Sequence, residues 1–172
     1  VGTDIGAALT IIGALGVDGI GLNCATGPKE MAEHLRQLSH GWNGFLSVQP
    51  NAGLPELRCG HTHYPLGPDE LAIWLRRFVE EDGVNMVGGC CGTGTDHIAA
   101  LDTMLRDLAD DGFRPTPRSR EVMREPQLAS LFSAVDLRQE NAWLAIGERC
   151  NANGSKKFRQ LQEAGDWDGC VA

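Results

Sequence analysis

The sequence predicts an α/β fold with a parallel β-sheet, and three observations lead to this prediction. Short apolar segments typical of strands alternate with longer segments whose apolar residues recur at helical spacing. Turns rich in glycine and proline separate these segments. The helical segments are about 10 to 15 residues long, which suits crossovers between neighbouring parallel strands.

The first expected strand lies between two expected helices. Residues 3–15 are small and apolar at helical spacing, residues 18–23 have the composition of a short strand, and residues 28–39 have the pattern of a helix. Proline in the first turn of this helix is favourable, because its missing N–H would have no helical partner there. The apolar stripe of the helix consists of Met31, Leu35 and Leu38.

A second strand and helix follow. Residues 44–49 are expected to form the strand, and the segment 50–67, dense in proline and glycine, a loop. Residues 68–83 are expected to form a helix that ends near Gly83. Two of its aromatic residues are expected in the core, and its apolar face comprises Leu71, Trp74, Leu75 and Phe78.

The third unit has the same order. Residues 84–88 are expected to form a strand, the segment GGCCGTGT a glycine-rich turn, and residues 95–111 a helix whose end at Asp110 and Asp111 is exposed. Three strands are too few to close a barrel by themselves. The aligned apolar residues of the helix are Ile98, Leu101, Leu105 and Leu108.

The chain changes character after residue 112. Residues 113–142 contain three prolines, many charges and no clear strand, so we expect an interdomain connector with a little helix. A new strand is expected over 143–148. A loop and a helix follow it, and Ser155 is a suitable N-cap for this helix.

The composition argues against several classes of protein. The 172 residues carry a net charge of −8, and binders of nucleic acids or anionic membranes need a basic surface instead. No apolar run approaches the roughly 20 residues that span a bilayer, and the first residues lack the basic region of a signal peptide. We therefore expect a cytoplasmic protein whose six cysteines are reduced.

Three cysteines are expected to meet in space although they lie far apart in the sequence. Cys24 follows the first strand, and Cys90 and Cys91 follow the third. Because parallel strands end at the same edge of a sheet, their thiols should converge. Thiolates bind zinc tetrahedrally, and catalytic zinc sites leave the fourth position open. Glycines around Cys90 and Cys91 provide the irregular backbone that two adjacent ligands need.

Other interpretations of these cysteines stay open at this point. Cys24 could be a buried core residue, and Cys90 and Cys91 could be an incidental pair or a vicinal disulfide. The histidine pair His61 and His63 suits a solvated loop better than a metal site. His97 is expected to cap or pack at a helix start, and Asn23 to hold loop backbone. The cysteines without a partner at ligand spacing, which we interpret as free thiols, are Cys59, Cys150 and Cys170.

A zinc site made of three thiolates would favour one kind of chemistry. Its ligands carry more negative charge than the ion carries positive charge, so bound water would be only weakly activated. A thiol in the fourth position would still lose its proton, whereas a free thiol with a pKa near about 8.5 is mostly protonated at neutral pH. Such a site suits attack by a substrate thiolate on an alkyl group.

Three segments resemble a known family in order and in position. GLNCATGP, SVQPNAGLPE and VNMVGGCCGTGTDHIAAL are similar to the C-terminal part of the homocysteine-binding barrel of cobalamin-dependent methionine synthases. The resemblance implies the last βα units of an incomplete (β/α)8 TIM barrel over residues 1–112. It also implies that Cys24, Cys90 and Cys91 are zinc ligands. Asn51, in the second segment, is implied to bind substrate or to occupy the fourth zinc position; the alternative is an asparagine that supports its own turn.

A further segment, IGERCNANGSKKF, resembles the opening of the pterin-binding barrel that follows in the same family. The resemblance implies an interdomain connector over 113–142 and the first βα unit of a second barrel over 143–172. In this segment Glu148 and Asn151 are implied to face the pterin of methyltetrahydrofolate.

The resemblance implies a complete reaction of which this chain carries one part. Homocysteine would bind zinc as a thiolate and take a methyl group from methylcobalamin to give methionine, with methyltetrahydrofolate as the ultimate donor. The first strands of the barrel would lie upstream of this sequence, and the remaining folate, cobalamin and activation modules downstream. A fragment of this kind is not expected to turn over alone.

Two alternatives remain. The same homocysteine-binding barrel occurs in betaine- and S-methylmethionine-dependent homocysteine methyltransferases, although these lack the pterin-like segment. In a second alternative, of another class, the protein is a non-catalytic domain with structural zinc or redox-responsive cysteines. Such a domain would have a closed site, with Cys59 or a histidine as the fourth ligand.

Overall fold

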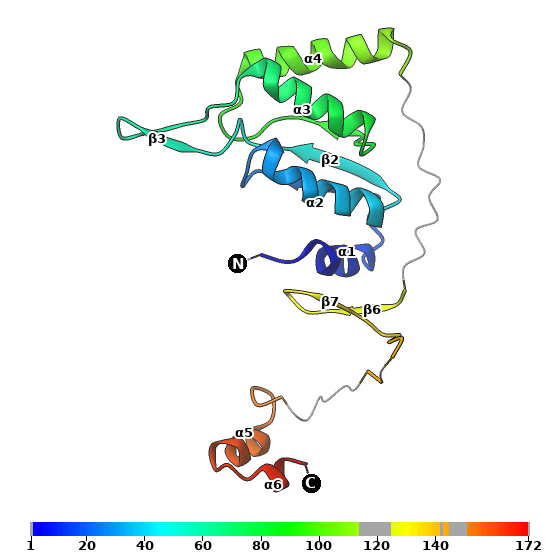
Figure 1. The fold of residues 1–172 in the computed structure, drawn as a ribbon, viewed down its shortest axis with the longest axis vertical. Coiled ribbons are helices and arrows are strands. Elements are labelled where there is room, and N and C mark those ends of the chain that lie inside the picture. The colour runs from blue at the N-terminus through cyan, green and yellow to red at the C-terminus, as the bar shows by residue number, and fades with distance from the viewer. Residues whose placement is uncertain (1, 114–124, 142, 145–150, 172) are drawn as a thin grey trace. The chain divides into compact units, whose positions relative to one another are not determined.

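The computed structural model describes residues 2–113, 125–141, 143–144 and 151–171 (Figure 1). Contacts divide the chain into two units, Val1–Asp136 and Leu137–Ala172, and each is described here by itself. No helix among the described residues is long and apolar enough to cross a membrane.

A three-stranded parallel sheet organises the first unit, as the sequence predicts. Its strands are β1 (Gly19–Asn23), β2 (Phe45–Gln49) and β5 (Met86–Val87), in the spatial order β1-β2-β5. All five residues of β1 pair with β2, and Ser47 and Val48 of β2 pair with β5. The third strand is shorter than the predicted 84–88. All three strands run in one direction, so their carboxyl ends lie at one edge.

Four helices lie among the described residues of this unit, and their starts follow the expected chemistry. The Asp4 side chain caps the first helix by accepting the Gly6 N–H, while proline stands in the first turn of the second and third. The fourth begins after Gly94, whose N–H donates to Nδ1 of His97 at 3.2 Å. The helices are α1 (Ile5–Gly13), α2 (Pro28–Gly41), α3 (Pro68–Glu80) and α4 (Thr95–Asp110).

The core lies where these helices cover the sheet. The predicted stripe of α2 is buried, and so are Leu71, Leu75 and Phe78 of α3, while Trp74 is half-buried beside Phe78. The predicted stripe of α4 is partly wrong. Its buried residues are Leu101, Met104 and Leu108, whereas Ile98 and Leu105 are exposed. Met104 and Leu105 both continue the apolar stripe of α4 from Leu101. The helix packs against α3, and Met104 is the one that is buried.

The opposite face of the sheet is open in the described residues. Side chains alternate along a strand, so Leu46 and Val48 of β2 face the core while Phe45, 66% exposed, faces away. Met86 of β5 is similarly 63% exposed. A hollow of about 500 Å³ lies over the strands on residues that include Gly19, Phe45 and Met86.

Two antiparallel hairpins correct the sequence-based prediction. The segment 50–67, predicted as a loop, contains β3 (Glu56–Arg58) paired with β4 (His61–His63). Its turn places Cys59 and Gly60 at positive φ, a turn geometry that suits a hairpin. The segment 113–142, predicted without a strand, contains β6 (Gln127–Ala129) paired with β7 (Ala134–Asp136).

The second hairpin is attached to the first helix. The Asp4 backbone N–H donates to the Phe132 carbonyl at 3.1 Å. The Thr10 hydroxyl donates to Gln127 Oε1 at 2.8 Å. The turn is closed by Ser130, whose Oγ accepts the N–H groups of Phe132 and Ser133. These runs are too short for the alternation that predicts a strand.

In the second unit the described residues form two helices, α5 (Lys156–Glu163) and α6 (Trp167–Val171). Ser155 caps α5 as predicted, since its side chain accepts the Phe158 N–H. The helix α6 was not predicted. The expected strand over 143–148 lies largely outside the described residues, although Trp143 and Leu144 are described and are not in a strand.

Candidate functional site

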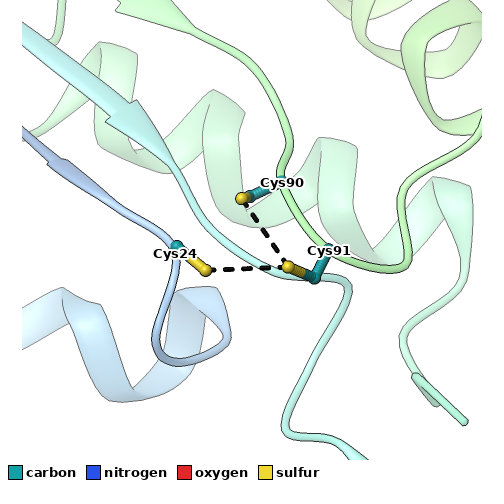
Figure 2. A group of neighbouring side chains, drawn as sticks. All are labelled: Cys24, Cys90 and Cys91. Atoms are coloured by element: carbon teal, nitrogen blue, oxygen red, sulfur yellow. Dashed lines mark hydrogen bonds between the residues drawn. The ribbon is translucent and has the colours of Figure 1, made fainter. Parts of the chain in front are cut away.

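The three predicted cysteines converge at the carboxyl edge of the parallel sheet, as Figure 2 shows. Cys24 directly follows β1, and Cys90 and Cys91 follow β5. The Sγ atoms of Cys24 and Cys91 are 3.6 Å apart, and those of Cys90 and Cys91 are 3.9 Å apart. All three sulfurs lie within 4.8 Å of one another. All three residues are free cysteines, so the vicinal disulfide considered for Cys90 and Cys91 is not formed.

The loop that carries Cys24 has an unusual backbone. Cys24 and Ala25 both have positive φ, 64° and 66°, which is costly for residues with a side chain. Three backbone bonds hold this conformation: Cys24 N–H to the Gln49 carbonyl at 2.9 Å, Thr26 N–H to the Cys24 carbonyl at 2.8 Å, and Asn51 N–H to the Thr26 carbonyl at 3.0 Å. Backbone strain that the surroundings maintain is concentrated at functional sites.

The loop that carries Cys90 and Cys91 is bound to the loop after β2. The Cys90 N–H donates to the Pro50 carbonyl at 2.8 Å, and the Ala52 N–H donates to the Cys91 carbonyl at 2.9 Å. Thr93 closes the turn from the other side, because its hydroxyl donates to the Cys90 carbonyl at 2.6 Å. These bonds hold Cys90 and Cys91 in an irregular loop, as the glycine-rich sequence predicts, and both sulfurs lie in the cluster with Cys24.

Asn51 connects the two cysteine loops. Only 4% of its surface is exposed, and its Oδ1 accepts the Cys91 N–H at 3.1 Å. Its backbone N–H donates to the Thr26 carbonyl in the Cys24 loop at 3.0 Å. The amide oxygen that we considered as a zinc ligand is thus engaged with the backbone of a neighbouring cysteine.

Hydrogen bonds make the thiols unequal. The Ala25 N–H, with the side chains of Cys90, Cys91 and Asn51, lowers the pKa of Cys24 by stabilising its thiolate. Hydrogen bonding to Cys24 and Cys90 raises the pKa of Cys91. At a given pH, Cys24 is therefore closer to the form that binds a metal.

The cluster has the dimensions of a zinc site. Sulfurs at the corners of a tetrahedron lie about 3.8 Å apart when zinc–sulfur bonds are about 2.3 Å. The two measured separations of 3.6 and 3.9 Å are close to this value. Within the described part of the chain, this is the only group of three or more potential metal-binding side chains of Cys, His, Asp or Glu. These three sulfurs could therefore hold a metal ion.

The other singled-out residues lie away from the cluster or outside the description. His61 and His63 are exposed on β4, and Cys59 is exposed in the adjoining turn. His97 caps α4, and its Nε2 lies 3.0 Å from the Leu66 carbonyl. The Asn23 side chain reaches the Gln49 carbonyl only at 3.5 Å.

In the second unit, Asn151 is exposed, and its Oδ1 accepts the Asn153 N–H at 3.0 Å before α5. Glu148 and Cys150 lie outside the described residues, and Cys170 is a half-buried free thiol.

Sequence reasoning missed one residue beside the cluster. The ring of Tyr64 packs against Gly92, next to Cys91, and burial together with the nearby Cys91 raises the pKa of the phenol. It lies after β4, outside any periodic segment, and no ligand spacing marks it. The only available signal was that it is the one tyrosine of the chain.

Comparison with known proteins assigns the family. Residues 1–105 match the sequence profile described as homocysteine S-methyltransferase. The chain belongs to the homocysteine S-methyltransferase family. It is 50% identical over 171 residues to methionine synthase of Mycobacterium leprae and 49% identical over 171 residues to that of Mycobacterium tuberculosis. These matches cover 99% of this chain but 14% of each relative. The predicted resemblance to methionine synthases is confirmed, and this chain spans about a seventh of their length.

Proposed function

We propose that this chain supplies the zinc-binding part of a site that activates homocysteine for methyl transfer. The observation that carries the proposal is the convergence of three thiols, at zinc-compatible separations, on the carboxyl edge of the sheet. Active sites of parallel α/β barrels are built on this edge. Membership of the homocysteine S-methyltransferase family supports homocysteine as the substrate.

The residues of the chain would act through position and charge. Cys24, Cys90 and Cys91 would hold the ion, and Asn51 keeps the backbone of Cys91 in place. A zinc ion bound there would supply the positive charge that keeps a homocysteine sulfur deprotonated in the fourth position. Three thiolates exceed the charge of the ion, so that sulfur would remain electron-rich and nucleophilic toward a methyl group.

The rest of the reaction belongs to other parts of a longer protein. We propose methylcobalamin as the methyl donor and methyltetrahydrofolate as its source, with Glu148 and Asn151 facing the pterin. The identity to methionine synthases extends beyond residue 105 to nearly the whole chain. This supports the methionine synthase type of reaction over the betaine- or S-methylmethionine-dependent types.

We also propose that the first unit is the C-terminal part of a (β/α)8 barrel over residues 1–112. Residues 113–142 would then be a connector, and residues 143–172 the start of the pterin-binding barrel. The open sheet face with its hollow supports this arrangement, because further strands would enclose Phe45 and Met86.

Metal content tests the proposal directly. In the full-length protein that contains this chain, we expect about one zinc per chain, lost in Cys24→Ser. Cys59→Ser is the matched control, because Cys59 is an exposed free thiol on the β3–β4 turn. A folded wild-type protein without zinc, or a Cys24→Ser variant that keeps it, would refute the proposal.

The structural-zinc alternative makes a different prediction. A closed site needs a fourth protein ligand, and Cys59, His61 and His63 do not join the cluster in the structure. X-ray absorption of the zinc protein with and without homocysteine separates the two. An additional sulfur neighbour on adding homocysteine supports the open site, and an unchanged spectrum supports the structural alternative.

A further inference from the structure

The loop 88–94, which carries two of the three clustered cysteines, belongs to a closed circuit of hydrogen bonds. The Cys91 carbonyl accepts the Ala52 N–H at 2.9 Å, and the Ala52 carbonyl accepts the Leu66 N–H at 3.0 Å. The circuit thus passes from the loop to the segment after β2 and on to the stem of the β3–β4 hairpin. This half of the circuit consists of backbone groups.

His97, in the first turn of α4, closes the circuit. Its Nδ1 accepts the Gly94 N–H at 3.2 Å, and its Nε2 lies 3.0 Å from the Leu66 carbonyl. Because Nδ1 is an acceptor, the proton of the neutral ring is on Nε2, which donates to the Leu66 carbonyl. Gly94 directly precedes α4, at the end of the loop in which the circuit began. His97 contributes the one side chain of this circuit, so it is the member that a substitution can remove.

The segment that accepts the His97 bond is anchored in the fold. Leu66 is half-buried and packs against the hydrophobic core, and Ala52 is buried. The ring of Tyr64 lies against Gly92, where φ is +80° and a Cβ would overlap the ring carbons. His97 therefore ties the end of the loop 88–94 to a packed part of the first unit.

The loop is thus held at three places. At its start, the Cys90 N–H donates to the Pro50 carbonyl at 2.8 Å. In its middle Cys91 is bound to Ala52, and at its end Gly94 is joined to the hairpin stem through the imidazole. A binding segment that is ordered in advance loses less conformational freedom when its ligand arrives. Removing the third fixed point should therefore loosen the loop and weaken binding to its thiols.

We propose that His97 is a positioning residue of the thiol cluster. By joining the start of α4 to Leu66, it keeps the loop 88–94 in the conformation that brings its two sulfurs into the cluster. The inference rests on the proposed function, since it concerns the same three cysteines. It goes beyond a helix cap, because a cap needs only the acceptor Nδ1, whereas positioning also needs the donor Nε2.

Two substitutions separate these tasks of the ring. The side-chain oxygen of asparagine can replace Nδ1 as an acceptor, and the side-chain nitrogen of glutamine can replace Nε2 as a donor. His97→Asn therefore keeps the helix cap and loses the bond to Leu66, whereas His97→Gln keeps a donor for this bond. A role as helix cap alone predicts that His97→Asn leaves the loop unchanged. A positioning role predicts that His97→Gln preserves the loop and that His97→Asn does not.

Hydrogen–deuterium exchange in the full-length protein, after removal of metal by a chelator, reads the loop without depending on activity. We expect the peptide over 88–94 to exchange about 3- to 10-fold faster in His97→Asn, which corresponds to one lost hydrogen bond. Zinc affinity, measured by competition with a chelator, should fall by a similar factor of about 3 to 10. Both quantities should stay within about twofold of wild type in His97→Gln.

His34→Asn is the matched control, because His34 is exposed on α2, and we expect no change in it. Exchange and affinity unchanged in His97→Asn, or equal losses in His97→Asn and His97→Gln, would overturn the inference. Faster exchange throughout α4 in both variants would also overturn it, by showing a general structural role. A folded wild-type protein that binds no zinc would overturn the proposed function, while exchange of the loop still decides whether His97 holds it.

Discussion

Asn51→Ala is the substitution whose effect follows most directly from the geometry. It removes the acceptor of the Cys91 N–H, a bond of 3.1 Å from a side chain that is only 4% exposed. Losing such a hydrogen bond costs about 1–2 kcal/mol. In the variant, metal binding itself would have to order the Cys91 loop. We therefore expect zinc affinity to fall about 5- to 30-fold, which is this free energy expressed as a ratio.

Competition with a chromophoric chelator measures this affinity in the full-length protein. Asn23→Ala is the matched control at the neighbouring strand end, because its side chain is exposed and reaches the Gln49 carbonyl only at 3.5 Å. We expect its affinity to stay within about twofold of wild type. An Asn51→Ala variant that binds zinc as tightly as wild type would show that the loop is ordered without this bond, contrary to our reasoning.

Two further predictions concern stability and pH. Phe78→Ala, at a side chain 1% exposed, should lower the free energy of unfolding by about 3–5 kcal/mol. Ile73→Ala, 69% exposed on the same helix, should change the free energy of unfolding by about 0.5 kcal/mol at most. Equal losses of the two variants in chemical denaturation would contradict the described core. Zinc affinity should rise with pH, because the metal displaces thiol protons. Because its pKa is lowered, Cys24 gains its proton at a lower pH than Cys91, whose pKa is raised. The slope of log affinity against pH should therefore steepen as pH falls, by about one for each further proton, and a flat profile between about pH 6 and 8 would be contrary to this.

The meeting of the cysteines could be predicted because it depends only on strand direction. Once β1 and β5 are parallel members of one sheet, Cys24 and Cys91 must follow strand ends at one edge. The convergence is confirmed by the structure, and the role of these thiols as zinc ligands stays a prediction. The buried stripe of α2 could also be predicted from the sequence, because no second apolar face competes with Met31, Leu35 and Leu38.

The remaining features depend on contacts that local pattern does not encode. In α4, Met104 and Leu105 both continue an apolar line from Leu101, and only the packing against α3 decides between them. The β6–β7 hairpin has strands of three residues, too short to show alternation, and is bound to α1 through side chains such as Thr10. Tyr64 packs against Gly92, next to Cys91, and its neighbour Leu66 is bound to Ala52, a contact between the two ends of the segment 50–67.

The thiols of the first unit lie apart from its core. A substitution can therefore impair folding or impair the thiol site, one without the other. Changes at buried residues such as Leu75 reduce the folded population, so a cell would contain less of the protein. Changes at Cys24 or Cys91 fall in loops at the sheet edge, so we expect abundance to persist while the proposed zinc-dependent activity is lost. An immunoblot of protein abundance would thus sort variants into these two groups before any activity assay. The loops at the sheet edge could also be diversified while the sheet and its helices stay unchanged.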